Sequence, residues 1–196
     1  FINIDGVSGG SSIQFATAAA NNTQPTERAR IDASGNIGLG VTPSAWQAAY
    51  RALQIGKTAV WWANSASDDW YIGNNYYFDG ALKRISTGYA TEYAQYTGNH
   101  VWSTAGSSTA GSAVSFTQAM TLNASGNLGI GTTSPKSDDG GNKLEISDSA
   151  NTVVTITATN DTTPILNFRS NAVDRLSILS SSSYGANFLV RSNQDM

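Results

Sequence analysis

The chain has 196 residues, of which 40% are hydrophobic and 13% charged, and its formal net charge is -3. Its 11 Lys and Arg residues are spread along the chain rather than clustered for phosphate binding, so we expect no nucleic-acid partner. The absence of cysteine excludes disulfides and thiolate metal sites, and no window approaches the roughly 18 consecutive apolar residues of a membrane span.

Short apolar runs predict an all-β fold. Each run is rich in Ile, Val, Phe and Thr and is bounded by Gly, Asn, Ser or Pro, which is typical of strands and their turns. In chain order, the predicted strands are residues 3–7, 12–16, 37–41, 53–55, 114–117, 153–158, 165–169, 176–179 and 188–190. One short helix is predicted over residues 44–53. Ser44 can cap it, and Trp46, Ala49 and Tyr50 would share one face.

A ten-residue sequence occurs twice in the chain. Residues 33–42 read ASGNIGLGVT and residues 124–133 read ASGNLGIGTT, so the copies are 91 positions apart, and a proline follows each. Self-similarity at a fixed spacing is typical of stacked repeat units. We therefore expect three modules. The predicted boundaries are residues 1–43 for the end of a first module, 44–135 for a complete second one, and 136–196 for the start of a third that continues beyond the chain.

Glycines alternate with apolar residues in each copy. Ile37, Leu39 and Val41 would form one face of a strand, whereas the opposite face carries almost no side chain. Such glycines usually allow another backbone to approach closely. We therefore expect a neighbouring strand or chain against the glycine face, and the apolar residues in a core. The predicted structural motif consists of Gly35, Asn36, Gly38, Gly40, Gly126, Asn127, Gly129 and Gly131.

The segment of residues 60–102 contains eleven of the 19 aromatic residues. Such rings either stack on sugar faces or supply the burial that a glycine-rich module lacks, and both interpretations stay open. If the segment contacts a receptor, the candidate residues are Trp70, Tyr76 and Tyr77. Otherwise we expect most of a second set to be more than half buried within an oligomer, with Trp70 and Tyr76 as exceptions. That set is Trp61, Trp62, Tyr89, Tyr93 and Trp102.

No motif indicates catalysis. The glycines of the first copy follow the order G-x-x-G-x-G with no helix after them, which does not match a dinucleotide-binding loop. Residues 138–142 lack the ligand pattern of a calcium loop, and His100 is the only histidine. The acids Asp68, Asp69, Asp79 and Glu92 could supply a glycosidase pair, but spacing in the sequence cannot show that two of them face each other. We expect no enzymatic activity, catalytic residue, metal or cofactor.

Residues 26–40 and 119–135 resemble a signature that recurs in bacteriophage tail fibre proteins, and residues 77–120 resemble the body of such modules. The resemblance implies an elongated, repeat-containing homotrimeric fibre of short strands, with at most one short helix per module. It also implies a place in the virion, on the extracellular side of the host. The implied partners are other tail or baseplate proteins and host cell-surface polysaccharide or protein.

Three functions are compatible with these observations. The first is a structural segment of a phage tail fibre that extends from the virion and supports host attachment. The second is a glycan-binding receptor module that uses residues 60–102, and the third is a bacterial surface adhesin built from similar repeats. The first residues lack an initiating Met and a signal layout, which predicts an internal fragment. Residues 193–196 correspond to residues 117–120, which predicts another motif copy beyond Met196.

Overall fold

The computed structural model describes residues 2–5, 12–18, 20, 23–136, 143–147, 154, 165–170, 173–180 and 186–189. These residues form strands, turns and loops with no helix, so the predicted all-β class is confirmed. The chain divides into two compact units, residues 1–149 and 150–196. The module boundaries predicted at residues 43 and 135 describe sequence repetition rather than compactness, and they stay a prediction.

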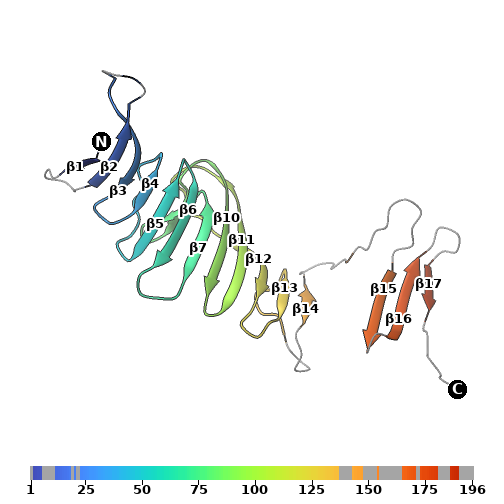
Figure 1. Ribbon diagram of the computed structural model, residues 1–196. Coiled ribbons are helices and arrows are strands. Elements are labelled where there is room, and N and C mark those ends of the chain that lie inside the picture. Colours follow the sequence, from blue (N-terminus) through green and yellow to red (C-terminus); the bar gives the residue numbers. More distant parts are fainter. Residues whose placement is uncertain are drawn as a thin grey trace. The chain divides into compact units, whose positions relative to one another are not determined.

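Twelve strands of the first unit form one sheet in which each strand pairs with the next strand of the sheet along the chain (Figure 1). They are β1 (Ile2–Asp5), β2 (Ser12–Thr17), β3 (Thr26–Ile31), β4 (Ile37–Leu39), β5 (Tyr50–Ile55), β6 (Ala59–Asn64), β7 (Trp70–Asn74), β10 (Gly88–Tyr96), β11 (Asn99–Ser108), β12 (Thr117–Leu122), β13 (Leu128–Ile130) and β14 (Leu144–Ile146). All neighbours are antiparallel except β4 with β5 and β13 with β14, which are parallel. A separate hairpin of β8 (Tyr77–Phe78) and β9 (Leu82–Lys83) lies between β7 and β10 in the chain.

The second unit contains a three-stranded antiparallel sheet. Its strands are β15 (Ile165–Ser170), β16 (Val173–Ser180) and β17 (Ala186–Leu189). The predictions of strands over residues 165–169 and 176–179 are confirmed, and the prediction over residues 188–190 is confirmed for its first two residues. Residues 138–142, and all but Val154 of the strand predicted over residues 153–158, lie outside the described residues.

The two copies of the sequence motif form the same local structure. In each copy a tight turn joins two antiparallel strands, and the second strand then pairs in parallel with the next one. The Gly35 N–H donates to the Asp32 carbonyl at 3.0 Å, and the Gly126 N–H donates to the Asn123 carbonyl at 2.9 Å. Gly35 has φ +82° and Gly126 has φ +80°. Glycine occupies both positions because L side chains rarely adopt this left-handed backbone.

A buried asparagine ties each turn to the following strand. The Asn36 side-chain oxygen accepts from the Ala52 N–H at 3.1 Å, and the Asn127 oxygen accepts from the Lys143 N–H at the same distance. Both asparagine side chains are buried. Because a buried backbone N–H needs an acceptor, the asparagine supplies one at the point where the parallel pairing begins.

The helix predicted over residues 44–53 is wrong. Residues 44–49 form a loop, and the chain then enters β5, whose backbone pairs with β4 and β6. The Trp46 ring is buried against Trp62, with ring centroids 5.6 Å apart, and the Gln47 N–H donates to the Phe78 carbonyl at 2.8 Å. Sheet pairing on two sides and burial of one large ring therefore outweigh the local preference for a short helix.

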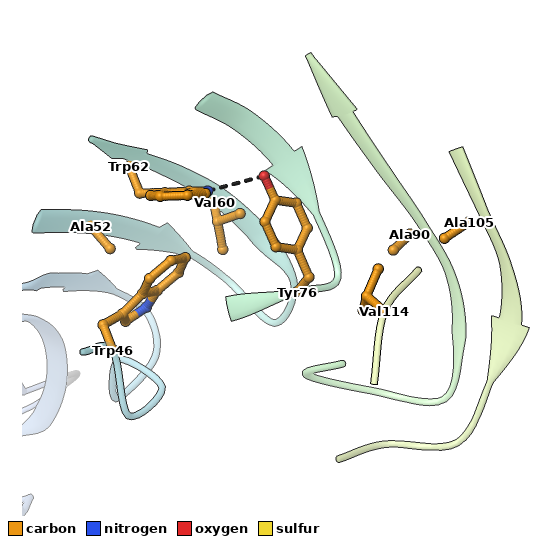
Figure 2. Packing of buried hydrophobic residues seen from close by; sticks show 8 residues of the cluster. All are labelled: Trp46, Ala52, Val60, Trp62, Tyr76, Ala90, Ala105 and Val114. Atoms are coloured by element: carbon orange, nitrogen blue, oxygen red, sulfur yellow. Dashed lines mark hydrogen bonds between the residues drawn. The ribbon is translucent and has the colours of Figure 1, made fainter. Parts of the chain in front are cut away.

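One face of the sheet is covered by loops of the same chain. The covering segments are residues 42–49, 75–87 and 109–116, and backbone hydrogen bonds such as that from the Val114 N–H to the Leu82 carbonyl at 2.9 Å hold them together. Small or aromatic residues meet beneath them in a core (Figure 2). Its buried members are Trp46, Ala52, Val60, Trp62, Tyr76, Ala90, Ala105 and Val114. We call this side of the sheet the covered face and the opposite side the open face.

Candidate functional site: the open face of the sheet

The open face carries an unbroken line of apolar side chains across eleven strands. Each member lies directly opposite the next in the strand register, from Ile13 on β2 to Ile146 on β14. Cross-strand neighbours of this kind contact one another on a sheet face. We call this line the apolar row. Its members are Ile13, Ile31, Ile37, Leu53, Trp61, Ile72, Tyr93, Trp102, Met120, Ile130 and Ile146.

Two further lines of side chains run beside the apolar row, one on each side and also in direct register, and we call them the first flank and the second flank. The first flank is formed by Phe15, Ala29, Leu39, Ile55, Ala59, Asn74, Thr91 and Thr104. The second flank is formed by Arg51, Ala63, Trp70, Gln95, His100, Leu122, Leu128 and Leu144. Among these described row and flank positions, Arg51 is the only Lys, Arg, Asp or Glu. The open face is therefore an extended surface with almost no charge.

Large apolar side chains of the open face are solvent-accessible in the single chain. Trp61 is 53% exposed, Leu39 48%, Ile55 46%, Ile72 44% and Ile37 43%. Soluble monomers rarely expose contiguous apolar patches of more than a few hundred Å². The expectation that Ile37 and Leu39 enter a core is therefore wrong for the single chain, because the loops that form the core cover the other face.

An aromatic cluster occupies the centre of the open face. Trp61 and Trp70 have ring centroids 5.9 Å apart, Trp70 and Tyr93 are 5.9 Å apart edge to face, and Tyr93 and Trp102 are 5.0 Å apart. A chain of hydrogen bonds fixes their positions. The Trp70 indole N–H donates to the Gln95 Oε1 at 2.8 Å, and the Gln95 Nε2 donates to the Tyr93 hydroxyl at 2.7 Å. The Tyr93 hydroxyl also bonds to the Nδ1 of His100.

The three candidate receptor residues are not brought together. Trp70 lies on the second flank and is half-buried, whereas Tyr77 lies on β8 in the loops of the covered face and packs against the core. Tyr76 is 0% exposed, so the expectation that it would be an exposed exception is wrong. Its ring fills the space beside Gly73, where no side chain competes for the volume. Trp61 and Tyr89, in contrast, are the exposed rings of the segment.

Tyr76 bridges the buried Trp62 and the partly buried Glu92 on the covered face. Its hydroxyl accepts from the Trp62 indole N–H at 3.0 Å and donates to the Glu92 Oε2 at 2.5 Å. Burial raises the pKa of Glu92, because the charged carboxylate is disfavoured away from water. Burial also raises the pKa of Tyr76, and it raises the pKa of Tyr71 to about 12. The network pairs polar groups next to the core and has a structural role there.

The motif glycines do face a close backbone neighbour, as expected, but that neighbour belongs to the same motif. A Cβ on Gly38 would lie 2.0 Å from the Val41 carbonyl oxygen, and a Cβ on Gly129 would lie 2.8 Å from the Thr132 Cγ2 and 3.0 Å from its carbonyl oxygen. The loop after each short strand folds back over the glycine. The glycines therefore serve the motif's own turn rather than contact with another chain.

The apolar row itself was missed by sequence reasoning. The available signal was the alternation in residues 59–63 and 90–95, where small residues such as Ala90 and Ala94 separate larger ones. Trp61 and Trp62 are adjacent in one strand and therefore point to opposite faces of the sheet. A count of aromatic residues ignores this difference and assigns both the same role. The strand predicted over residues 114–117 is also largely wrong, because β12 begins at Thr117 and the preceding residues form a covering loop.

Among the described residues there is no cluster of three or more His, Cys, Asp or Glu side chains able to hold a metal ion. The described part of the chain also contains no helix of the length and hydropathy needed to span a membrane. Comparison with protein-family models, with curated proteins and with solved structures finds no match. The open face and the sequence motif are therefore the features of the chain that bear on its function.

Proposed function

We propose that this chain is a structural segment of a bacteriophage tail fibre, and that it acts as a homotrimer which extends from the virion and supports host attachment. The apolar row is the single observation that carries this proposal. A large, nearly uncharged surface needs a partner to remove it from water, at about 25 cal/mol per Å² of buried apolar area. The doubled motif supports the assignment to tail fibres through its resemblance to their recurrent signature.

The direction of the row suits a rod. The row crosses the strands, so it runs along the direction in which strands are added to the sheet. Neighbouring strands lie about 4.8 Å apart, so eleven strands extend over about 50 Å. An interface along this row would continue through each further motif of the same kind, which is the property that a fibre shaft needs. Tail and baseplate proteins at its ends, and a host surface beyond, are the partners of such a segment.

Two measurements test the proposal. Sedimentation or light scattering of the purified chain should give three times the mass of one chain, and a monomeric mass would contradict the trimer. Immunogold electron microscopy should place an antibody against the chain along the tail fibres of phage particles that encode it. Labelling of bacterial cells without phage would instead support the surface adhesin.

A second candidate function is glycan binding by the open face. The cluster of Trp61, Trp70, Tyr93 and Trp102 presents rings next to Asn74, and such surfaces stack on sugars while amides hydrogen-bond to hydroxyls. This function needs the face to be open, whereas the trimer closes it. Host-cell binding by a monomeric chain, lost on Trp61→Ala, would favour the glycan module.

A further inference from the structure

We propose that in the assembly the apolar row of each of three chains lies along a common axis, and that the first flank of each chain packs against the second flank of the next. This inference rests on the proposed trimer and names its interface. A cyclic assembly joins two different patches of each chain, so it needs two complementary surfaces on every copy. The two flanks are such surfaces because they lie on opposite sides of the row.

The flanks are complementary in shape at the level of β4 to β6. A hollow of about 350 Å³ lies on the second-flank side, lined by residues that include Gly35, Arg51 and Ala63. At the same level, the first flank carries Leu39 and Ile55, both of which are exposed. In a parallel cyclic assembly, corresponding strands of neighbouring chains lie at the same height along the axis and contact one another. The two aliphatic side chains of one chain therefore enter the hollow of the next.

At the level of β7 to β11 the relation is reversed. Here a hollow of about 420 Å³ lies on the first-flank side, lined by residues that include Asn74, Thr91 and Thr104. The second flank at this level carries its bulkiest side chains, and the hydrogen bonds to Gln95 and Tyr93 hold them in place. These side chains are Trp70, Gln95 and His100. The first flank is thus bulky at the level of β4 to β6 and hollow at the level of β7 to β11. The second flank is hollow at the level of β4 to β6 and bulky at the level of β7 to β11.

The size profile of β6 favours three chains over two. On β6 the open face reads Ala59, Trp61, Ala63, with the largest side chain in the middle and the smallest on the flanks. Three sheets that form the sides of a triangle are far apart at their centres and close together at their edges, so they need this profile. Two sheets packed face to face stay about 10 Å apart across their width and need a uniform one.

Paired cysteines test this geometry, because the chain contains no cysteine of its own. In the double variant Ala59→Cys/Ala63→Cys, the two cysteines are four residues apart on one strand. Their Cα atoms are separated by about 13 Å, which is too far for a disulfide within one chain. Mild oxidation of the assembled protein should therefore convert most of it to covalent trimers on a denaturing gel. Each single variant should stay uncrosslinked, because one flank does not meet itself. A second pair, Thr91→Cys/Gln95→Cys, tests the same contact at the level of β10.

The outcomes separate this inference from the proposed function. A protein that sediments as a trimer but gives no covalent trimers from either pair retains the proposed trimer and overturns the flank contact. Covalent dimers as the end product would replace the threefold arrangement by a twofold one. Longer covalent ladders would show an open chain of copies. A monomeric wild-type protein would overturn both the interface and the proposed function.

Discussion

A single hydroxyl pairs with two polar groups of the covered face, one buried and one partly buried. Tyr76 accepts from the Trp62 indole and donates to Glu92, so its loss leaves an indole N–H and a carboxyl group without their partner. We predict that Tyr76→Phe lowers the free energy of unfolding by about 1–3 kcal/mol, the cost of one unpaired buried polar group, because Trp62 is buried whereas Glu92 is only partly buried. Denaturant unfolding measures the loss. An unchanged midpoint would show that water replaces the hydroxyl.

Glu92 gives the fold a pH dependence of predictable sign. Burial raises its pKa above the ordinary value of 4.5, so the folded state binds its proton more tightly than the unfolded state does. This contribution to stability is complete below the unfolded pKa and is lost as pH rises through the folded pKa. We predict that Glu92→Gln, which keeps an acceptor for Tyr76, flattens the decline in melting temperature from about pH 4.5 upward. Equal slopes for both proteins would contradict the burial of a titrating carboxyl.

The two motif glycines should differ in their tolerance of a methyl group. A Cβ on Gly38 meets a backbone oxygen at 2.0 Å, whereas a Cβ on Gly129 meets a methyl group at 2.8 Å and a backbone oxygen at 3.0 Å. We predict that Gly38→Ala reduces thermal stability more than Gly129→Ala, because a backbone atom has less freedom to move aside. Lys57→Ala, at an exposed turn, serves as the control and should leave the melting temperature unchanged.

At the scale of the element, β6 offers a matched pair of tryptophans. Trp62 is 5% exposed on the covered face and Trp61 is 53% exposed on the open face. We predict that Trp62→Ala costs about 3–5 kcal/mol of stability through the cavity that it leaves. Trp61→Ala should mainly weaken assembly. Unfolding of dilute protein and sedimentation of concentrated protein separate the two effects, and equal effects of both variants on unfolding and assembly would contradict the two-faced strand.

The elements differ in how far the sequence predicts them. The motif strands and turns are predictable because Gly35 and Gly126 need a left-handed backbone and the flanking residues alternate locally. The long strands of residues 88–108 were missed because their pattern mixes aromatic, small and polar residues on each face. Residues 44–49 have the sequence pattern of a short helix but form a loop. The role of Trp46 in the core becomes apparent only from its contacts with residues later in the chain, such as Trp62 and Tyr77.

At the scale of the whole molecule, assembly should be visible in the melting behaviour. If folding and association are coupled, the melting temperature rises with protein concentration, because association stabilises the folded state by mass action. We predict that Ile72→Asp, which places a charge in the apolar row, abolishes this dependence. Ser67→Asp adds the same charge at an exposed turn and should retain it. A concentration-independent wild-type melting curve would contradict coupled assembly.

The site as a whole was predictable only in part. The motif predicts that Leu128 and Ile130 share an apolar strand face, and Ile130 is exposed in the structure. That another chain covers this face stays a prediction. Which side chains continue the apolar row through the centre of the sheet depends on the ten strand registers between β2 and β14, and a shift of one residue would exchange the two faces. The sequence does not reveal those registers, because bulges such as that between Trp102 and Ser103 reset the alternation.

The order of the strands has a consequence for how the chain acquires its structure. Every strand of the twelve-stranded sheet pairs with the sheet strand that precedes it along the chain, and the longest connections are residues 75–87 between β7 and β10 and residues 131–143 between β13 and β14. Short loops close at little entropic cost, so the sheet can grow from one end, with each finished strand as a template for the next. Folding during synthesis on the ribosome would follow the same direction. Each emerging strand would find its neighbour already in place, whereas the apolar row would wait for other chains.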